Sequence, residues 1–387
     1  MALTHRITIV TLVLLLTVAL LHFLSISSLL RSASPAIPAK PWPLPKLKRV
    51  TTPPSVRLQF PMPKEERPME CIGRQYDIST MPSVSVIIPY LQEDLRLLDK
   101  TLGSLLANTP PELLDMILLV DDGNDANHSF ADDLVDLHPK VRVHRNSERQ
   151  GLIKAKVTGA SHTESPVIIF MEPHCIANRQ WLEPLLERLM DSPRRVVVPV
   201  IDIIPEDYTD LYEYVPGMYG GFGWDLEFKW AGTAQERNAS YHTPDPFPMP
   251  CLSGGILALR RDWWEMSGEY DDEMQEWGSE HIEMSLRSWR CGAGVEAVPC
   301  SRIGHMFRKA RPYPFHGEAS NRNKKRLISV WFENYADRVF EVEPHLRDMS
   351  DLGDVSARIA IKEKLGCESM DWYVQNVYPE LEKEKKQ

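Results

Sequence analysis

Residues 116–122 read MILLVDD, an apolar run that predicts a β-strand ending in two carboxylates, Asp121 and Asp122. Similar runs along the chain read SVSVIIP, PVIIFME and RVVVPVID, at residues 83–89, 166–172 and 195–202. Between the runs lie amphipathic stretches with apolar residues at helical spacing, such as residues 97–106 and 181–190. Strands that alternate with helices predict an α/β protein with a mainly parallel central sheet flanked by helices. Ligands bind such sheets beyond the carboxyl ends of the strands, where these carboxylates lie.

The composition is that of an acidic globular protein. The 387 residues include 44 Lys and Arg and 54 Asp and Glu, which gives a formal net charge of −10. A nucleic-acid-binding protein carries a basic surface on its folded body, so this acidic excess argues against that class. A hydrophobic share of 43% and a charged share of 25% exclude intrinsic disorder for most of the chain.

The N-terminal part has a different character. Residues 7–30 contain no Lys, Arg, Asp or Glu and are long enough to cross a bilayer as a helix. A cleaved signal peptide is the alternative, but its apolar region is shorter, about 7–15 residues. We therefore expect a short tail (residues 1–6), a transmembrane signal anchor (7–30), a proline-rich stem (31–70), a folded domain (71–380) and a charged tail (381–387).

Glu172 and His174 lie two residues apart at the end of the third strand run. Positions i and i+2 of a strand face the same side, so both side chains could approach one ion. Such a pair is common on protein surfaces, and a third ligand is needed; His305, in the run IGHMFRK at residues 303–309, is the candidate. Oxygen and nitrogen ligands suit a divalent ion such as Mn²⁺. Zinc is less favoured, since the chain has no Cys-x-x-Cys or His-Glu-x-x-His pattern.

Further motifs indicate a nucleotide and a sugar. Asp121 could accept hydrogen bonds from a ribose or a base, with an Asx turn as the alternative. Arg149 lies just before a predicted helix start, an arrangement that can bind an anion. Three glycine-containing strings, two of which also contain a tryptophan, are typical of loops that bring backbone and indole close to a sugar, although each could be a turn under a packed aromatic ring. They span residues 220–224, 253–256 and 276–281.

Taken in order, a series of motifs resembles the polypeptide N-acetylgalactosaminyltransferases over about residues 71–380. The motifs read VSVIIP, LLVDD, RQGLIKAK, a carboxylate-x-His strand end, NRQWLEPLL, GGFGWDLEFKW, SGGILALRR, WGSEHIEMSLRSWRCG, PCSRIGHMFRK and NVYPELE. The resemblance implies a GT-A nucleotide-sugar-binding fold of the glycosyltransferase family 27 type, preceded by the transmembrane helix. It also implies transfer of GalNAc from UDP-GalNAc to Ser or Thr hydroxyls of proteins, with retention and with Mn²⁺, the step that initiates mucin-type O-glycosylation.

The same resemblance implies roles for single residues. The ligands of Mn²⁺ would be Glu172, His174 and His305. The nucleotide would contact Asp121, Arg149, Trp277, Arg308 and Tyr313. The sugar would contact Gly254, Gly255, Glu280 and His281. The groove for the acceptor peptide would be lined by Phe222, Trp224 and Phe307. Among these, the residues expected to take part in catalysis are Glu280, Arg308 and Trp277. Arg308 would help the metal to stabilise the charge of the departing diphosphate.

The resemblance also bears on the compartment. It implies disulfides that join Cys71 to Cys300 and Cys291 to Cys367, and it leaves two cysteines unpaired, Cys175 and Cys251. Two N-glycosylation sequons begin at Asn127 and Asn238. Basic residues after the apolar span would by themselves favour a cytoplasmic body. Disulfides and sequons outweigh that signal and predict a single-pass type II Golgi membrane protein with a lumenal catalytic domain.

Three departures from the family pattern keep two alternatives open. Where the family has Asp-x-His, this chain has Glu172, whose carboxylate reaches one methylene further. His281 replaces an Asn that contacts the sugar, and an imidazole offers one donor and one acceptor in a different shape. The ricin-like lectin domain of most members does not follow NVYPELEKEKKQ, so glycan-directed acceptor selection is not expected. The alternatives are a related GT-A transferase for another UDP-sugar and a catalytically silent homologue that binds peptide or a partner transferase.

Overall fold

A computed structural model describes residues 63–65, 67–205, 212–215, 218–233, 244–309, 312–314 and 316–383. The chain divides into two compact units, residues 1–47 and 48–387, and every described residue belongs to the second. The expected membrane anchor and most of the expected stem lie outside the described residues. Within the described ranges no helix is both long and apolar enough to cross a membrane.

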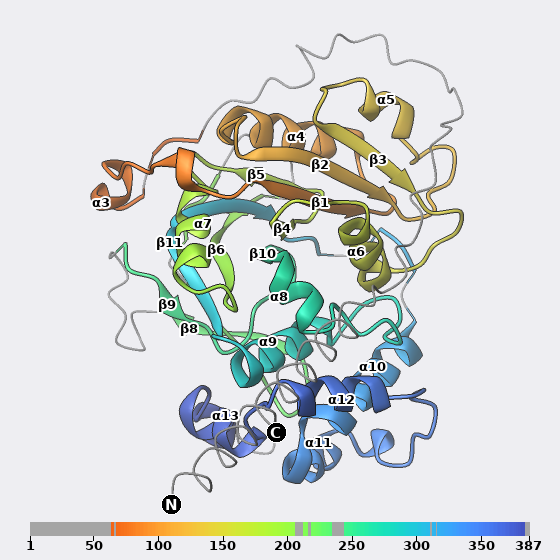
Figure 1. Ribbon diagram of the computed structural model, residues 1–387. Helices are drawn as coiled ribbons and strands as arrows, with labels where there is room; N and C mark the ends of the chain where they lie inside the picture. Colours follow the sequence, from red (N-terminus) through yellow and green to blue (C-terminus); the bar gives the residue numbers. More distant parts are fainter. Residues whose placement is uncertain are drawn as a thin grey trace, which may run out of the picture. The chain divides into compact units, whose positions relative to one another are not determined.

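A nine-stranded sheet forms the centre of the described part (Figure 1). Its order is β3-β2-β1-β4-β10-β6-β11-β5, and β9 pairs with β11 outside this path. The strands are β1 Val84–Tyr90, β2 Leu114–Asp121, β3 Val141–Arg145, β4 Val167–Phe170, β5 Cys175–Ala177, β6 Val196–Ile204, β9 Phe247–Pro248, β10 Leu257–Arg260 and β11 Val295–Met306. A second, antiparallel sheet is formed by β7 Met218–Phe222 and β8 Phe228–Thr233.

The central sheet is mainly parallel, as predicted, but it is mixed, because three of its nine strands run in the opposite direction. Strands β3, β2, β1 and β4 are parallel neighbours, and β6 is parallel to β11. Strand β10 runs antiparallel to both β4 and β6, and β5 and β9 run antiparallel to β11. The four predicted strands, β1, β2, β4 and β6, therefore share one direction. The antiparallel strands are only two to four residues long, too short to give a hydrophobic-run signal.

Both faces of the sheet are covered by helices. Strand β1 is buried at all seven positions, and its alternate side chains enter two different hydrophobic cores. Val86 and Ile88 pack in the core that includes side chains of α4 and α7, whereas Ile87 packs in the core that includes α6, α8 and α9. Two of these helices confirm predicted stretches, because α4 spans Leu95–Asn108 and α7 spans Glu183–Asp191.

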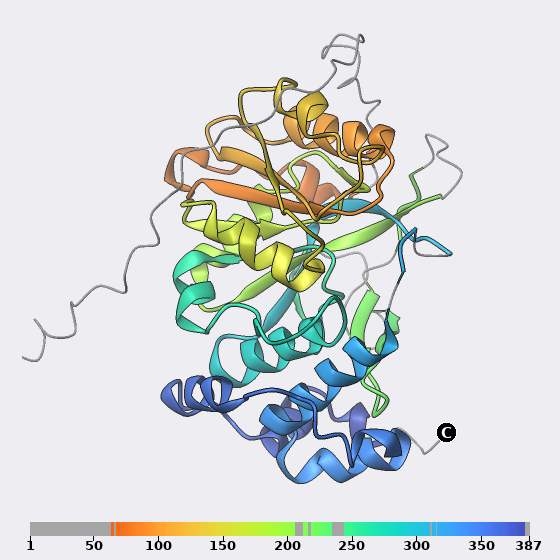
Figure 2. The ribbon, with the colours of Figure 1, turned by 90° about the vertical axis from the view of Figure 1, so that its right-hand side faces the viewer.

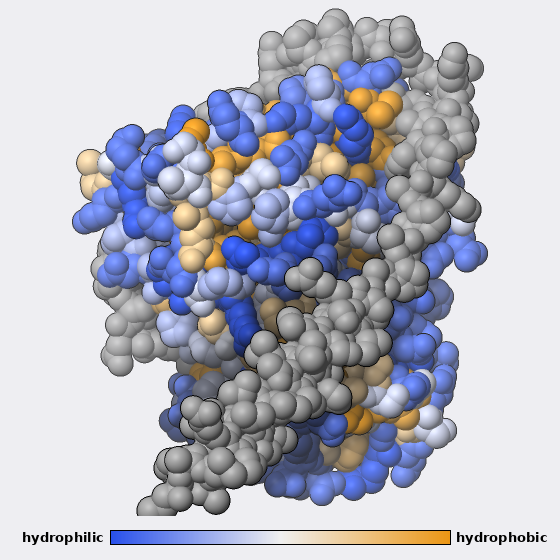
Figure 3. Space-filling model, viewed as in Figure 1, coloured by the Kyte–Doolittle hydropathy of each residue, from blue (hydrophilic) through white to orange (hydrophobic). Residues whose placement is uncertain are grey.

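The other helices complete the described unit. They are α3 Met69–Ile72, α5 Ala131–Val135, α6 Leu152–Ser161, α8 Arg261–Met266, α9 Glu280–Cys291, α10 Gly317–Trp331, α11 Ala336–Val342, α12 Ser356–Lys364, α13 Met370–Asn376 and α14 Glu380–Lys383. Short 3-10 helices are η1 Ile78–Thr80, η3 Glu333–Tyr335 and η4 Pro344–Leu346. In the two views of Figures 1 and 2, α10 to α13 lie on the side of α9 that faces away from β1 and β2. Hydrophilic side chains dominate the described surface in Figure 3.

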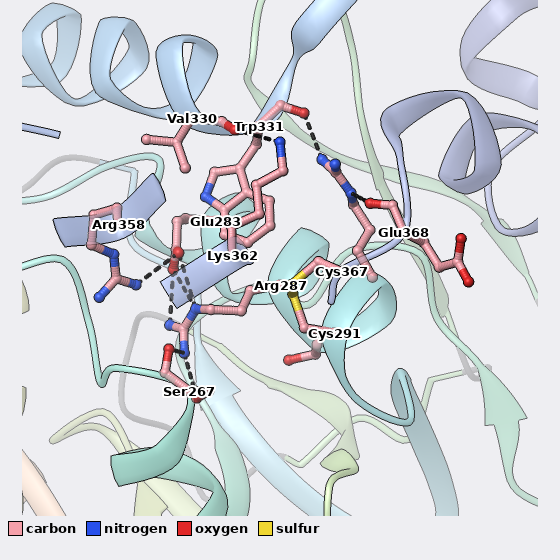
Figure 4. Close-up of a disulfide and its surroundings, with 12 residues drawn as sticks. Ser267, Glu283, Arg287, Cys291, Val330, Trp331, Arg358, Lys362, Cys367 and Glu368 are labelled. Atoms are coloured by element: carbon pink, nitrogen blue, oxygen red, sulfur yellow. Dashed lines mark hydrogen bonds and ion pairs between the residues drawn. A yellow bond between two sulfur atoms is a disulfide. The ribbon is translucent and has the colours of Figure 1, made fainter. Parts of the chain in front are cut away.

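Both implied disulfides are present. Cys71 at α3 is joined to Cys300 on β11, and Cys291 at the end of α9 is joined to Cys367 between α12 and α13 (Figure 4). The free and buried cysteines are Cys175 and Cys251, as expected. The C-terminal helices are thus tied covalently to α9, the helix that begins at Glu280.

Candidate active site

A pocket lies beyond the carboxyl ends of β1, β2 and β4, at the edge where the sequence placed a ligand. It encloses about 710 Å³ of empty space, part of it open to solvent. Its wall includes Tyr90 at the end of β1, Asp122 just after β2 and Glu172 just after β4. The predicted site residues in this wall are Arg149, Glu172, His174, Trp277, Arg308 and Tyr313. Residues from six separate parts of the chain therefore meet in one cavity.

The three predicted metal ligands come together at this pocket. Ligand atoms of Glu172, His174 and His305 all lie within 4.8 Å of one another. Glu172 Oε2 lies 3.3 Å from Nε2 of His174 and also contacts Nε2 of His305. His305 arrives through the antiparallel pairing of β11 with β5, in which it is the partner of Cys175. Glu172 and His174 lie in the bend between β4 and β5 rather than on a strand, so the prediction of strand spacing was wrong for this pair.

The chemistry of the cluster fits a divalent cation such as Mn²⁺. One carboxylate oxygen and two imidazole nitrogens form the donor set. His174 uses its other ring nitrogen, Nδ1, in a bond of 3.0 Å to Oε2 of Glu93, an arrangement that metal-binding histidines commonly have. Burial opposes ionisation of Glu172, but His305 and His174 hold the pKa of this carboxyl well below its ordinary value. Glu172 is therefore kept as an anion able to bind a cation.

The predicted sugar-binding residues lie beside this cluster. A Cβ atom on Gly255 would lie 3.1 Å from Cδ of Glu172, and one on Gly254 would lie 2.9 Å from Cβ of His281. Glu280 is 2% exposed and accepts a bond of 2.8 Å from the backbone N–H of Gly278. Burial opposes ionisation of Glu280, yet His281 and then a buried lysine lower its pKa to about 2. The loop and the start of α9 thus present a second anionic side chain next to the first.

Asp121, the expected nucleotide contact, is not among the described residues that line the pocket. It is fully buried, its Oδ1 accepts from Asn124 and its Oδ2 accepts from Ser129 at 2.6 Å. Its neighbour Asp122 lines the pocket instead and accepts from the backbone N–H groups of Gln150 and Gly151, at 2.9 and 2.8 Å. Asp122 therefore fixes the start of α6. The role of Asp121 as a uridine contact stays a prediction.

Arg149 joins two pocket-lining segments. Its guanidinium donates to the carbonyl of Pro314 at 3.0 Å and lies 3.4 Å from Oε2 of Glu276. Its Cζ lies 5.4 Å from the ring centroid of Tyr313. Arg149 and Tyr313, both predicted to contact the nucleotide, are therefore neighbours, and Trp277 follows Glu276 in the same wall.

The three aromatic residues expected in the acceptor groove do not share one surface. Phe222 is fully buried on β7 and stacks on Tyr373 of α13, with ring centroids 6.3 Å apart. Trp224 is 6% exposed and stacks on Tyr335, with ring planes inclined by 5°. Only Phe307, at 44%, is among the exposed large apolar residues of the described part. The C-terminal segment covers Phe222 and Trp224. The assignment of these residues to an acceptor groove stays a prediction.

Two buried ionic residues of the site escaped the sequence analysis. Glu93 lines the pocket in the loop after β1, and no motif marked it. Lys156 belongs to the motif RQGLIKAK, in which only Arg149 was predicted to be a site residue. Lys156 is 1% exposed and donates to the carbonyl of Gly254 at 2.8 Å. Its spacing from Ile153 and Ala160 puts it on the buried stripe of α6, a signal that could have identified it.

The glycosylation predictions can be followed at one site. Asn127 is exposed in the turn after β2, where its backbone N–H donates to Asp125 at 2.9 Å. Its position is open to a glycan, and glycosylation there remains a prediction. Asn238 lies outside the described residues.

Two family descriptions match the sequence. Residues 85–259 match Glycosyl transferase family 2, and residues 237–310 match the N-terminal domain of galactosyltransferase. The two matches together cover the pocket residues from β2 to β11. They agree with a nucleotide-sugar site at the edge of the sheet.

Full-length relatives give a more specific result. Polypeptide N-acetylgalactosaminyltransferase 11 of Xenopus tropicalis is 39% identical over 326 residues, which are 82% of this chain and 54% of that protein. Inactive polypeptide N-acetylgalactosaminyltransferase-like protein 5 of Macaca fascicularis is 37% identical over 322 residues, 81% of this chain and 71% of that protein. The chain spans about half the length of several curated relatives it matches.

A solved structure has the same fold. The crystal structure of GalNAc-T7 with UDP, GalNAc and Mn²⁺ superposes with a TM-score of 0.74 at 28% sequence identity. The match covers 83% of this chain and 61% of that one. The described unit therefore has the GT-A fold with a mixed sheet. On these similarities, this chain belongs to the polypeptide N-acetylgalactosaminyltransferase family.

Proposed function

We propose that this chain is a Mn²⁺-dependent, retaining glycosyltransferase that moves GalNAc from UDP-GalNAc to Ser and Thr hydroxyls of proteins. The observation that carries the proposal is the cluster of Glu172, His174 and His305, of which the first two line the pocket. Membership of the family supports the acceptor class. The similarity to GalNAc-T7, solved with UDP, GalNAc and Mn²⁺, supports the donor and the ion.

The residues of the candidate site have different proposed roles in binding the ion, the diphosphate and the sugar. Glu172, His174 and His305 would hold Mn²⁺, which when bound acts as a Lewis acid toward the departing diphosphate. Arg308 and Arg149 line the same pocket and carry the charge that attracts a diphosphate. The sugar would lie against Gly254, Gly255, Glu280 and His281.

The pocket offers no free side-chain nucleophile among its described carboxylates. Each of them already accepts a hydrogen bond or an ion pair from this protein: Glu93, Asp122, Glu172 and Glu276. This supports direct attack by the acceptor hydroxyl on the face from which UDP departs, with the phosphate taking the proton. A covalent glycosyl-enzyme intermediate would need one of these carboxylates to be released.

For the compartment we infer a type II Golgi membrane protein with a lumenal catalytic domain. Two disulfides support an oxidising environment. The uncharged run at residues 7–30 supports a membrane anchor.

Two observations favour specific alternatives. His281 is 5% exposed and its Nε2 has no hydrogen-bond partner within the described ranges, so it could select another UDP-sugar. The macaque relative is named inactive, and Glu172 departs from the family's Asp, which together favour a silent homologue. The alternatives differ in donor turnover and in metal dependence.

A donor panel tests the proposal. The purified full chain is incubated with Mn²⁺, a Ser/Thr peptide and UDP-GalNAc, UDP-GlcNAc, UDP-galactose or UDP-xylose, with Glu172→Gln as the inactive control. The proposal expects glycopeptide from UDP-GalNAc that EDTA abolishes. Preference for another donor supports the first alternative. Absence of turnover together with metal-independent UDP binding supports the second.

A further inference from the structure

Glu93 is a buried carboxylate at the wall of the pocket, and both of its oxygens are used. Its side chain is 1% exposed. Oε2 accepts from Nδ1 of His174 at 3.0 Å, and Oε1 accepts from the guanidinium of Arg308. Oε1 also accepts from the backbone N–H of Asp94 at 3.0 Å, which fixes the carboxylate at the start of α4. Glu93 thus links a predicted metal ligand to a predicted diphosphate contact.

The sheet explains why these groups meet. His174 precedes β5 and Arg308 follows β11, and β5 pairs with β11 in antiparallel register. The backbone N–H of Met306 donates to the carbonyl of His174 at 3.2 Å, so the two segments run side by side. The loop after β1 places Glu93 against this pair. The contact therefore depends on tertiary pairing, with 81 and 215 residues separating Glu93 from its two partners.

The bond to Glu93 determines how His174 presents its ring. An ionised carboxylate can only accept, so Nδ1 of His174 must carry the proton. The nitrogen that faces the other two predicted metal ligands is then Nε2, which lies 3.3 Å from Oε2 of Glu172. A carboxylate behind a metal-binding histidine fixes both the tautomer and the ring orientation, and losing it typically costs 10–100-fold in metal affinity.

The bond to Arg308 has a parallel effect on the anion contact. The Arg308 side chain is 20% exposed and lines the pocket, so its guanidinium can reach a bound ligand while one nitrogen stays on Glu93. Without this buried anion the long side chain would lose its fixed point and gain rotamer freedom. If Glu93 served only to neutralise Arg308, its second hydrogen bond, from His174, would not be needed.

We propose that Glu93 is a positioning residue that holds His174 for the metal and Arg308 for the diphosphate at the same time. The proposal rests on the proposed metal and nucleotide site. Glu93 touches neither ligand and acts through its two partners. It follows that one substitution should weaken two binding events that are measured separately, Mn²⁺ without nucleotide and UDP without metal.

The test is Glu93→Gln in the full chain. The glutamine keeps the size of the side chain but removes the charge that holds Arg308. Mn²⁺ binding is titrated by electron paramagnetic resonance of the free ion, and UDP binding is titrated in EDTA by calorimetry. We expect a 10- to 100-fold weaker Mn²⁺ affinity, as for other carboxylates behind metal-binding histidines. UDP binding in EDTA should weaken at least threefold.

The matched control is Glu183→Gln, which removes another buried carboxylate, 6% exposed at the start of α7. It should leave both affinities within twofold of the wild type. If the wild type binds no Mn²⁺, the proposed function fails. If the wild type binds Mn²⁺ and Glu93→Gln binds it equally well, only the present proposal is overturned. Should Glu93→Gln not fold, Glu93→Asp replaces it, and an unchanged Mn²⁺ affinity there overturns the proposal as well.

Discussion

Nζ of Lys156 lies 2.8 Å from the carbonyl oxygen of Gly254. A buried cation therefore holds the loop that lies beside the predicted metal ligands. Burial lowers the pKa of Lys156, and the nearby Glu280 and Glu172 act in the opposite direction. The ammonium is therefore stabilised by Glu280 and Glu172, two carboxylates of the candidate site.

Replacing this cation should impair donor binding. We expect Lys156→Met to raise KM for the UDP-sugar about 10- to 100-fold. A hydrogen bond from a charged donor is worth about 1.5–3 kcal/mol, and each 1.4 kcal/mol corresponds to a factor of about ten in affinity. Steady-state kinetics with varied donor measure the change. Lys154→Met, on the same helix but only partly buried, is the control. Equal KM values for the two variants would contradict a specific role of Lys156.

The lack of a side chain at Gly255 should be needed for metal binding. A Cβ there would lie 3.1 Å from Cδ of Glu172, closer than about nine in ten real Cβ contacts, so the carboxylate would have to move by a few tenths of an ångström. We expect Gly255→Ala to weaken Mn²⁺ binding about tenfold by titration of the free ion. Gly317→Ala is the control, because a Cβ at Gly317 meets nothing within 4 Å.

The buried ion network on α9 predicts how stability depends on pH. Glu283 accepts from Arg287 and Arg358, at 2.9 Å in each case, and Figure 4 shows the three side chains facing one another. Burial opposes ionisation of Glu283, but the two arginines hold its pKa below the ordinary value of 4.5. Its ionisation therefore stabilises the fold above pH 4.5, and this contribution is lost as the pH falls through the lowered pKa.

The Glu283→Gln variant should consequently be less stable than the wild type at neutral pH, and this difference should be smaller in acid. Removing one partner of a buried pair costs about 3–5 kcal/mol, because the arginines keep their charge. Denaturant unfolding at pH 7 and at pH 3.5 measures the free-energy difference from the wild type, which should shrink at the lower pH. Glu265→Gln, at an exposed position on α8, is the control. A difference that stays constant with pH would contradict the ionised network.

The disulfide between Cys291 and Cys367 should contribute to stability. It closes a loop with a sequence separation of 76 and joins α9 to the C-terminal helices. We expect the double variant Cys291→Ser/Cys367→Ser to lose about 2–5 kcal/mol, as for other native disulfides. Thermal unfolding without reductant measures the loss. Equal midpoints for the variant and the wild type would show that packing alone holds this segment.

The sequence predicted the strands and helices that have long apolar patterns and missed those that depend on tertiary pairing. Runs such as 116–122 gave correct strands, because a buried strand needs apolar side chains on both faces. Strand β10 has only four residues, and nothing in LALR indicates that it inserts antiparallel between β4 and β6.

The candidate site shows the same difference between residues that sequence patterns identify and residues that depend on tertiary contacts. The motifs identified Glu172, His174 and His305 as a set, and the structure brings their ligand atoms together. Which of Asp121 and Asp122 faces the pocket could not be predicted, because adjacent residues at a strand end point to opposite sides and the register decides. Lys156 could have been found by its helical spacing. Glu93 could not, since its partners are 81 and 215 residues away.

The extra methylene of Glu172 and the lack of a side chain at Gly255 should be energetically coupled. Glu172→Asp shortens the side chain and withdraws its carboxylate from Gly255. A Cβ added at residue 255 would then meet less crowding. We expect Gly255→Ala to weaken Mn²⁺ binding about tenfold in the wild type and less than threefold in the Glu172→Asp background. A double-mutant cycle on Mn²⁺ affinity gives the interaction energy, which should exceed about 0.5 kcal/mol for groups in contact. If the two effects add without interaction, the close approach of Gly255 does not determine the position of the metal-binding carboxylate, and the glutamate is tolerated for another reason.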